Sequence, residues 1–485
     1  MSIKIESTVT GELRDFYRHV HFHPTDAIED DWGRAILDRI ADDRAAGTVR
    51  MYAMLEDIVS VGEDGGLQYT FDEGDRRLDY LVEKGFDILL SYNFIPPAIS
   101  SDPEEVGTVC KNPTRYKGKF ITTAPPADFD LWEEICRVYT EHIVERYGIE
   151  RVSGWMLQCY NEPDESQFFM KKAGSDLERA EAYCLLYKHF ARGVRSVSER
   201  LKIGGPALGS HLDFLGIFLD FVKREALPLD YIFFHTYGVH PSELTEGGLS
   251  VSQLEDKARR VIDFVCERGF GDRTFINDEW GAATCGYFNS EENPALFFRE
   301  TEVFSAYYVK VIDRYINSRM PIEKMMICLS GQHEMKSDFS GFRGFFTLNG
   351  YPKPIYNAYV LASRLGGELL AVGGELDDRL TLIATRRSDG SYALLMCYAA
   401  DNFSDNIPDL TLDLSLPRPT SRLWRIDSTH ASALYAYKTC GSPDDPTDEE
   451  RAKINALASL SPQKLSGTEI SIKMTANAVI LIETE

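Results

Sequence analysis

The sequence predicts an α/β protein built as a (β/α)₈ TIM barrel with an accessory C-terminal β-sandwich domain. Short apolar runs alternate with long helical patterns over most of the chain, and several runs are continuously apolar, as in strands covered on both faces. After about residue 366 the pattern changes to short strands alone. With 485 residues and 44% apolar content, the chain can form one large core and a smaller one.

Eight runs qualify as strands of the barrel. They are residues 18–22, 49–55, 87–94, 154–160, 202–206, 231–235, 274–276 and 325–329. Eight strands that alternate with helices are typical of a (β/α)₈ barrel. An open, doubly wound sheet is the alternative, but no Gly-rich phosphate-binding loop follows the first run, which disfavours it.

Helix signals lie between these runs. Residues 129–147 repeat apolar side chains at helical spacing, and Gly148 follows as a stop signal. The capping-box pattern Ser175-Asp-Leu-Glu178 opens another helix. The pair Asn293-Pro294 is a cap followed by proline at the first helical position, and it predicts a helix that continues to about residue 318.

The C-terminal part has the pattern of a β-sandwich. Its strand candidates, separated by Asp-, Gly- and Ser-containing turns, are residues 383–386, 392–398, 410–414 and 478–482. We therefore expect three parts: residues 1–15 as a strand that joins the accessory domain, residues 16–365 as the barrel, and residues 366–485 as the sandwich. The polar, Pro- and Asp-rich stretch 441–450 predicts a surface loop.

Composition excludes several classes of protein. The formal charge of −24, from 76 acidic and 52 basic residues, repels phosphate backbones and anionic lipid, so we expect neither a nucleic-acid nor a membrane partner. No apolar signal segment opens the chain, and nine cysteines are scattered without a CxxC pair. A cytoplasmic location with reduced thiols, no cofactor and no metal is expected. The sequence leaves a homo-oligomer open.

Two acidic residues stand where catalytic side chains of a barrel are found, just past the C-terminal ends of strands. The fourth run leads into Asn161-Glu162-Pro163, and the seventh into Asp278-Glu279-Trp280. Strands four and seven lie across the barrel mouth, so both carboxylates can face one cleft. Glycosidic cleavage needs such a pair, one to protonate the departing oxygen and one to attack or support the sugar carbon.

The pair Glu162 and Glu279 therefore predicts a glycoside hydrolase, and Asn161 is placed to hydrogen-bond the sugar 2-hydroxyl. The alternative from a different class is a carbohydrate-binding barrel without turnover. The presence of both carboxylates disfavours it.

These motifs resemble glycoside hydrolase family 39, which contains β-xylosidases and α-L-iduronidases within a clan of retaining (β/α)₈ enzymes. The resemblance covers nearly the whole chain, and it is carried by residues 50–52, 155–164, 230–237, 278–280 and 344–354. It implies Glu162 as acid/base and Glu279 as nucleophile. It also implies that His235 and Tyr237 line the subsite of the cleaved sugar, with Tyr237 hydrogen-bonded to the nucleophile.

Further residues follow from the same resemblance. Glu334 aligns with a family carboxylate that binds sugar hydroxyls, and Trp280 either forms a wall of the site or packs behind Glu279. Tyr52 and Gln158 replace the family's His and Glu at positions around the sugar.

Basic and histidine residues near the first two strands complete the expected site. Arg50 reads as an ion-pair partner in the barrel core, and His21 and His23 as polar residues at the cleft rim or in the barrel core. His21 and His23 point the same way along a strand, but no third ligand is spaced nearby, which disfavours a metal.

The expected activity is a retaining, exo-acting glycosidase on plant-type oligosaccharides, with β-xylose as the first choice of sugar. Arabinopyranose, galactose and glucose remain alternatives because the departures from the family cluster around the sugar pocket. Iduronate is less favoured, since a uronate would need basic groups at the subsite.

Overall fold

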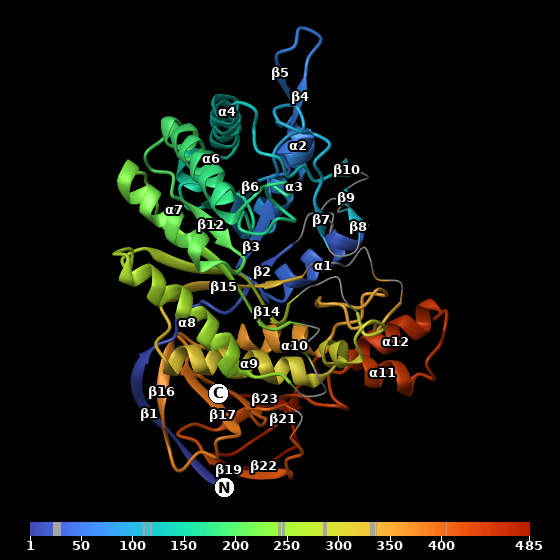
Figure 1. The fold of residues 1–485 in the computed structure, drawn as a ribbon. Helices are drawn as coiled ribbons and strands as arrows, with labels where there is room; N and C mark the ends of the chain where they lie inside the picture. The colour runs from blue at the N-terminus through green and yellow to red at the C-terminus, as the bar shows by residue number, and fades with distance from the viewer. Residues whose placement is uncertain are drawn as a thin grey trace.

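The structure, a computed structural model, describes residues 1–22, 31–109, 112–113, 115–116, 119–240, 244, 248–284, 289–329, 335, 337–403 and 405–485. The predicted fold class is confirmed. Eight parallel strands close into a barrel, and a nine-stranded, largely antiparallel sheet lies beside it (Figure 1). Among the described residues, no helix combines the length and apolarity needed to cross a membrane.

Each barrel strand overlaps one of the eight predicted runs. In order around the barrel they are β2 (His19–His21), β3 (Thr48–Tyr52), β6 (Asp87–Tyr92), β11 (Met156–Cys159), β12 (Ile203–Leu208), β13 (Tyr231–Val239), β14 (Thr274–Ala283) and β15 (Ile322–Cys328). The barrel closes where β15 pairs with β2. Its interior holds a small apolar layer, made of Leu89, Met156, Ala207, Phe233, Ile276 and Met326. This layer fills the barrel, so polar groups gather at its mouth.

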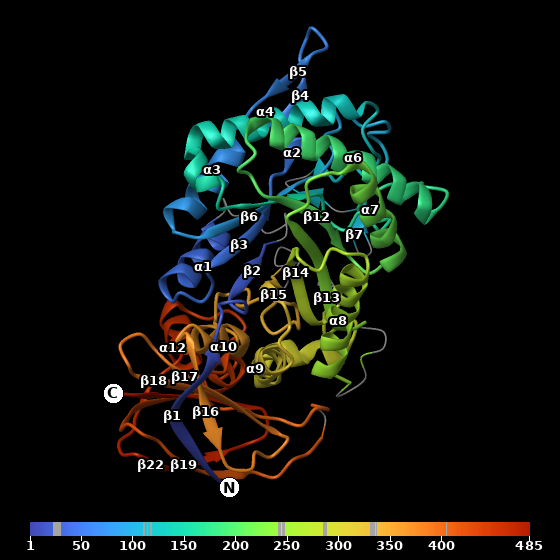
Figure 2. The ribbon, with the colours of Figure 1, turned by 90° about the vertical axis from the view of Figure 1, so that its left-hand side faces the viewer.

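Helices surround the strands of the barrel (Figure 2). They are α1 (Asp31–Asp42), α3 (Asp72–Glu83), α4 (Phe129–Tyr147), α6 (Asp176–Val197), α7 (Leu212–Glu225), α8 (Val251–Glu267), α9 (Glu302–Asn317) and α10 (Pro354–Ala362). Helix α6 begins at the predicted cap, where the Ser175 side chain accepts a hydrogen bond from the Glu178 amide. The Glu178 side chain accepts from the amide of Gly174 rather than from that of Ser175, so the capping box is only half formed. Shorter elements of the same part are α2 (Leu55–Ile58), β4 (Val59–Val61), β5 (Leu67–Tyr69), β7 (Thr108–Val109), β8 (Asn112–Pro113), β9 (Arg115–Tyr116), β10 (Lys119–Phe120) and α5 (Ile149–Val152).

One predicted helix is wrong in its extent. Asn293 caps a 3₁₀ helix, η1 (Pro294–Glu300), and α9 begins only after a break. Thr301 at the break is extended, with φ −120° and ψ 171°, which no continuous helix permits. The apolar periodicity runs across both pieces, so periodicity alone did not reveal the break.

The accessory sheet has the strand order β21-β20-β23-β18-β17-β16-β1-β19-β22. Its strands are β1 (Ser2–Glu12), β16 (Glu368–Gly373), β17 (Leu380–Arg386), β18 (Tyr392–Tyr398), β19 (Leu410–Ser415), β20 (Thr420–Ile426), β21 (Gln463–Lys464), β22 (Glu469–Met474) and β23 (Ala478–Thr484). The N-terminal strand β1 joins the C-terminal strands, because it pairs antiparallel with β16 and parallel with β19. The sheet encloses a second apolar core, which includes Ile5, Leu382, Leu394, Ile472 and Ile482.

Strand β18 is buried on both faces, and this joins the accessory sheet to the barrel. Leu394 and Met396 belong to the core of the sandwich, whereas Leu395 and Cys397 alternate with them and belong to the main core. Helix α9 covers this second face, where Lys310 donates to the carbonyl of Ala399 at 2.9 Å. The sheet therefore supports α9, which packs against strand β14 of the barrel.

A helical pair flanks the predicted C-terminal loop. α11 (Ala433–Thr439) and α12 (Asp448–Ala458) pack together, so the end of the stretch 441–450 is helical rather than loop. Thr447 and Glu450 form a capping box that starts α12. This capping box is visible in the sequence and marks the start of α12, although the polar, Pro- and Asp-rich composition of the stretch predicted a loop.

Candidate active site

Strand β14 directs two consecutive carboxylates into the barrel mouth. His235 on β13 pairs with Glu279, whereas the preceding Phe234 pairs with Asn277, so Asp278 is an extra residue in β14. Neighbouring residues of a regular strand face opposite sides, and a bulge of this kind lets both acids face inward. Both are buried, with Asp278 0% and Glu279 6% exposed.

The bulge also decides the direction of Trp280. Its ring is fully buried outside the barrel, where it stacks on Tyr308 of α9 and meets Phe304 edge-on. Of the two alternatives for Trp280, the structure therefore supports packing behind Glu279 rather than forming a wall of the site.

Glu162 lies on a tight turn after β11. Tyr160 and Glu162 both have positive φ angles, 69° and 41°, which cost on the order of 1 kcal/mol each in residues other than glycine. Hydrogen bonds hold the turn, since the Glu162 amide donates to the carbonyl of Ala207 at 3.1 Å. The Asp164 carboxylate accepts from the backbone amides of Gly209, Ser210 and His211. The turn that presents Glu162 is thus tied to the loop after β12.

The two predicted carboxyl groups meet at one point. One oxygen of Glu162, one oxygen of Glu279 and a ring nitrogen of His235 all lie within 4.8 Å of one another. The two carboxylates come from strand ends 117 residues apart, and the closed barrel brings them together.

The guanidinium of Arg50 is the centre of the polar network. It is fully buried and donates to Glu279 Oε1 at 2.8 Å and to Asn161 Oδ1 at 2.7 Å. It also contacts Asp278 Oδ2 at 3.0 Å and Gln158 Oε1 at 2.8 and 3.0 Å. Gln158 in turn donates to Asp278 at 2.7 Å. One cation therefore connects the ends of strands four and seven, and Arg50 is the core ion-pair partner that we expected.

His235 bridges two carboxyl groups. Its Nδ1 lies 2.6 Å from Glu162 Oε1, and its Nε2 lies 3.3 Å from Asp278 Oδ2. Burial lowers the pKa of His235, but the charges of Glu279, Asp278 and Glu162 outweigh it and raise the pKa to about 10. The imidazole is therefore protonated at neutral pH and donates to both neighbours.

Opposite pKa shifts separate the two carboxyl groups. Burial raises the pKa of Glu162 to about 7, although the nearby His235 lowers it and Glu279 raises it. Burial also acts to raise the pKa of Glu279, but the charges of His235, His21 and Arg50 outweigh it and hold the pKa well below its usual range. A proton donor and an anion thus stand side by side near pH 7. The Glu162 side chain is 14% exposed against 7% for Glu279, so Glu162 is the more open to solvent.

Tyr237 holds the second oxygen of Glu279. Its hydroxyl donates to Glu279 Oε2 at 2.6 Å and accepts from Arg343 Nη1 at 2.9 Å. A Cβ on Gly281, the register partner of Tyr237, would lie 3.1 Å from its ring, so glycine leaves room for the ring. With His21 Nε2 3.3 Å from Oε1, both oxygens of Glu279 are held in place.

The remaining predicted residues fall into three groups. Tyr52 lies at the site, with its ring 5.2 Å from that of His21 and Arg50 above it. Gln158 is fully buried, and both ends of its amide contact Arg50 and Asp278. His23 and Glu334 lie outside the described residues.

Sequence reasoning missed two contributors. Asp278 had a signal, because it stands directly before Glu279 in the motif, but only the bulge turns both acids inward. Arg343 comes from the segment after β15 and had no signal beyond its place next to the matched stretch 344–354.

Comparison with known proteins agrees with this geometry. The sequence profile of the glycosyl hydrolases family 39 matches residues 1–473. The chain belongs to this family. The family resemblance drawn from the motifs is therefore confirmed, and the protein is a glycoside hydrolase.

Individual relatives share about a quarter of their residues with this family 39 protein. A β-xylosidase of Caldicellulosiruptor saccharolyticus is 24% identical over 461 residues, which cover 92% of this chain and 88% of the relative. A β-xylosidase of Geobacillus stearothermophilus is 25% identical over 469 residues, 90% of this chain and 86% of the relative. The crystal structure of a monomeric β-xylosidase from Caulobacter crescentus CB15 has a TM-score of 0.81, 22% identity, and coverage of 100% and 99% of the two chains. The last likeness shows the fold.

The network around Arg50 makes a prediction for stability. Replacement of Arg50 by Met would leave Asp278 and Glu279 buried without their cation, and we expect the free energy of unfolding to fall by about 3–5 kcal/mol. The exposed pair of Arg14 and Glu323 offers a matched control, since Arg14→Met should cost about 1 kcal/mol or less. Urea unfolding of both variants measures the difference. Equal stability of the two variants would show that Arg50 does not hold the site together.

Proposed function

We propose that the protein is a retaining, exo-acting β-xylosidase in which Glu279 is the nucleophile and Glu162 the acid/base. The approach of one oxygen of Glu162 to within 4.8 Å of one oxygen of Glu279 carries this proposal. Carboxyl groups of retaining glycosidases lie roughly 5–5.5 Å apart, whereas inverting enzymes need about 6.5–9.5 Å to admit a water molecule between them and the sugar.

In the first step, a Glu279 oxygen attacks the anomeric carbon while Glu162 protonates the departing glycosidic oxygen. A bond from the carboxylate to the sugar forms as the bond to the leaving group breaks. Arg50 and Tyr237 keep Glu279 ionised and oriented for this attack. Asn161, whose amide oxygen is held by Arg50, offers its amide nitrogen to a sugar hydroxyl.

In the second step, Glu162 has lost its proton and acts as a base. It takes a proton from a water molecule, which attacks the anomeric carbon and releases Glu279. The protonated His235, 2.6 Å from Glu162, stabilises the carboxylate that exists between the two steps. His235 is thus a positioning residue for the acid/base, with Asp278 on its other side.

The choice of xylose rests on the relatives. The two β-xylosidases align over about nine-tenths of this chain, which supports the same sugar here. Arabinopyranosides, galactosides and glucosides are the alternative substrates, because Tyr52 replaces a family histidine beside the site. A uronate is less favoured, since the guanidinium of Arg50 is taken up by protein carboxylates and amides.

A panel of 4-nitrophenyl glycosides tests the sugar. We expect the highest kcat/KM on the β-D-xyloside, and we expect proton NMR of the first product to show retained β-configuration. A higher kcat/KM on another glycoside would replace xylose by that sugar. An inverted product would refute the double displacement.

Replacement of Glu279 by Ala tests the nucleophile. We expect kcat to fall by at least ~10³-fold, the scale of losing a covalent nucleophile. Added azide should restore part of the activity and yield the glycosyl azide of inverted configuration, because azide fits the space of the lost carboxylate. The exposed Glu323→Ala is the control and should retain full activity. Normal turnover by Glu279→Ala would remove Glu279 from the mechanism.

The pKa of Glu162 predicts the pH profile. Glu162 must be protonated to act as the acid, and its pKa is raised to about 7, so kcat/KM should fall as the pH rises through about 7. Glu162→Gln should abolish this alkaline limb. It should slow substrates with poor leaving groups about 10²-fold more than 4-nitrophenyl substrates, which need little protonation. Equal losses on both kinds of substrate would argue against the acid role.

A further inference from the structure

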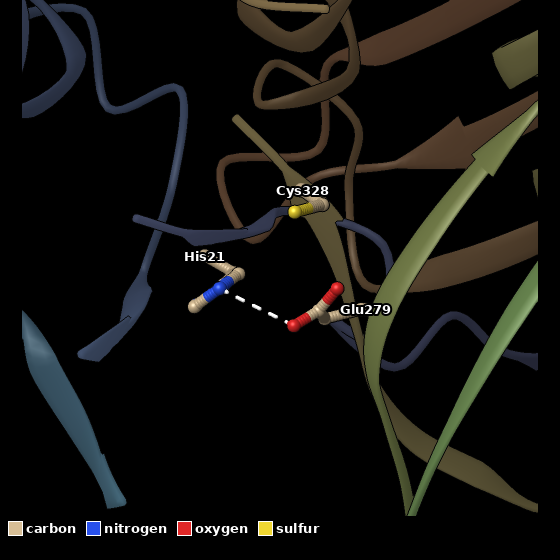
Figure 3. A group of neighbouring side chains, drawn as sticks. All are labelled: His21, Glu279 and Cys328. Carbon is tan, nitrogen blue, oxygen red and sulfur yellow. Dashed lines mark ion pairs between the residues drawn. The ribbon is translucent and has the colours of Figure 1, made fainter. Parts of the chain in front are cut away.

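A second cluster of side chains shares Glu279 with the proposed mechanism. His21 and Cys328 are the last residues of β2 and β15, and they are direct register partners in the barrel. Glu279 comes from β14, the strand on the other side of β15. Figure 3 shows the three side chains converging from their three strands.

The distances within this cluster suit a metal ion. One ligand atom from each residue, the His21 nitrogen, the Glu279 oxygen and the Cys328 sulfur, lies within 4.8 Å of the other two. Zn²⁺ binds such atoms at about 2.0–2.3 Å in a tetrahedron, which places neighbouring ligands roughly 3.3–3.8 Å apart. His21 Nε2 and Glu279 Oε1 are already 3.3 Å apart. The remaining separations need at most a shift of about 1 Å, within the reach of side-chain adjustment.

We propose that His21, Glu279 and Cys328 form a binding site for a soft divalent cation such as Zn²⁺, and that the bound ion inhibits hydrolysis. Imidazole nitrogen, thiolate sulfur and carboxylate oxygen are ligands that zinc accepts, and three of them leave the fourth position open for water. Binding releases the thiol proton of Cys328 to solvent and involves no change of oxidation state. The ion occupies Glu279 Oε1 and prevents its attack on the sugar.

Positive charge beside the cluster weakens binding of the cation, so the ion inhibits the enzyme and is not a permanent part of the structure. The guanidinium of Arg50 lies 2.8 Å from the same carboxylate and opposes a dication. Asp278, Glu279 and the Cys328 thiolate supply three negative charges that offset it. The sulfur ligand favours soft cations over Mg²⁺ and Ca²⁺, which prefer oxygen ligands.

The test uses the full chain and compares four proteins: wild type, Cys328→Ser, Cys328→Ala and Cys266→Ser. Cys266 is exposed and serves as the matched cysteine control. Cd²⁺ is the spectroscopic probe, because a thiolate ligand gives a near-ultraviolet charge-transfer band. We expect wild type and Cys266→Ser to bind Cd²⁺ at Cys328 with this band, and both Cys328 variants to lose that contribution.

Zinc inhibition gives the second measurement. The zinc concentration for half-inhibition should rise at least about tenfold in the Cys328 variants, since even the loss of a residue that only supports a ligand costs 10–100-fold in metal affinity. A chelator should restore wild-type activity, and Mg²⁺ should not inhibit. The Ala variant keeps a small apolar side chain in case the buried Ser impairs folding, which circular dichroism checks.

Three outcomes would overturn the proposal: an unchanged cadmium band in the Cys328 variants, equal zinc sensitivity of all four proteins, or equal inhibition by Mg²⁺. The inhibitory effect rests on the proposed role of Glu279, but the cadmium titration does not. Loss of the proposed glycosidase mechanism with an intact cadmium band would therefore be distinguished from loss of the metal site.

Discussion

The buried guanidinium of Arg50 is the interaction on which the site depends. It contacts Asn161 at the end of β11 and Asp278 and Glu279 on β14, so the same cation ties together the two strand ends that carry the proposed catalytic groups. A buried charge is tolerated only when it is paired and hydrogen-bonded. This requirement is met by four polar partners of Arg50: Asp278, Glu279, Gln158 and Asn161. The need to satisfy one buried cation explains why so many polar side chains are buried at the mouth of the barrel.

The same charges separate the roles of the two carboxyl groups. Arg50 and His235 are two cations among three acids, Asp278, Glu279 and Glu162. The charges of His235, His21 and Arg50 hold the pKa of Glu279 well below its usual range, whereas burial raises the pKa of Glu162 to about 7, so Glu162 is the acid that keeps its proton near pH 7. Neighbouring carboxyl groups thus acquire different pKa values from their position alone, as a double displacement requires.

The accessory sheet reaches this site through α9. Strand β18 packs one face against the helix, and Tyr308 of the same helix stacks on Trp280, the residue that follows Glu279. Trp280 faces outward because Asp278 forms a bulge in β14. The same extra residue therefore lets Asp278 face the barrel mouth and lets Trp280 anchor β14 to α9. A contiguous path of packed side chains therefore runs from the accessory domain to the proposed nucleophile.

The sequence by itself determined the barrel, the accessory β-domain and the motifs of Glu162 and Glu279. Apolar periodicity indicates which segments are buried, and the C-terminal ends of the strands indicate where a barrel places its catalytic side chains. Only the tertiary structure decided which residues meet. The break at Thr301, the inward turn of Asp278, the contact of Arg343 with Tyr237 and the approach of Cys328 to His21 depend on backbone irregularities and on register between strands distant in the chain. The pairing of Cys328 with His21, for example, leaves no local pattern, because it arises only when the barrel closes and β15 comes to lie beside β2.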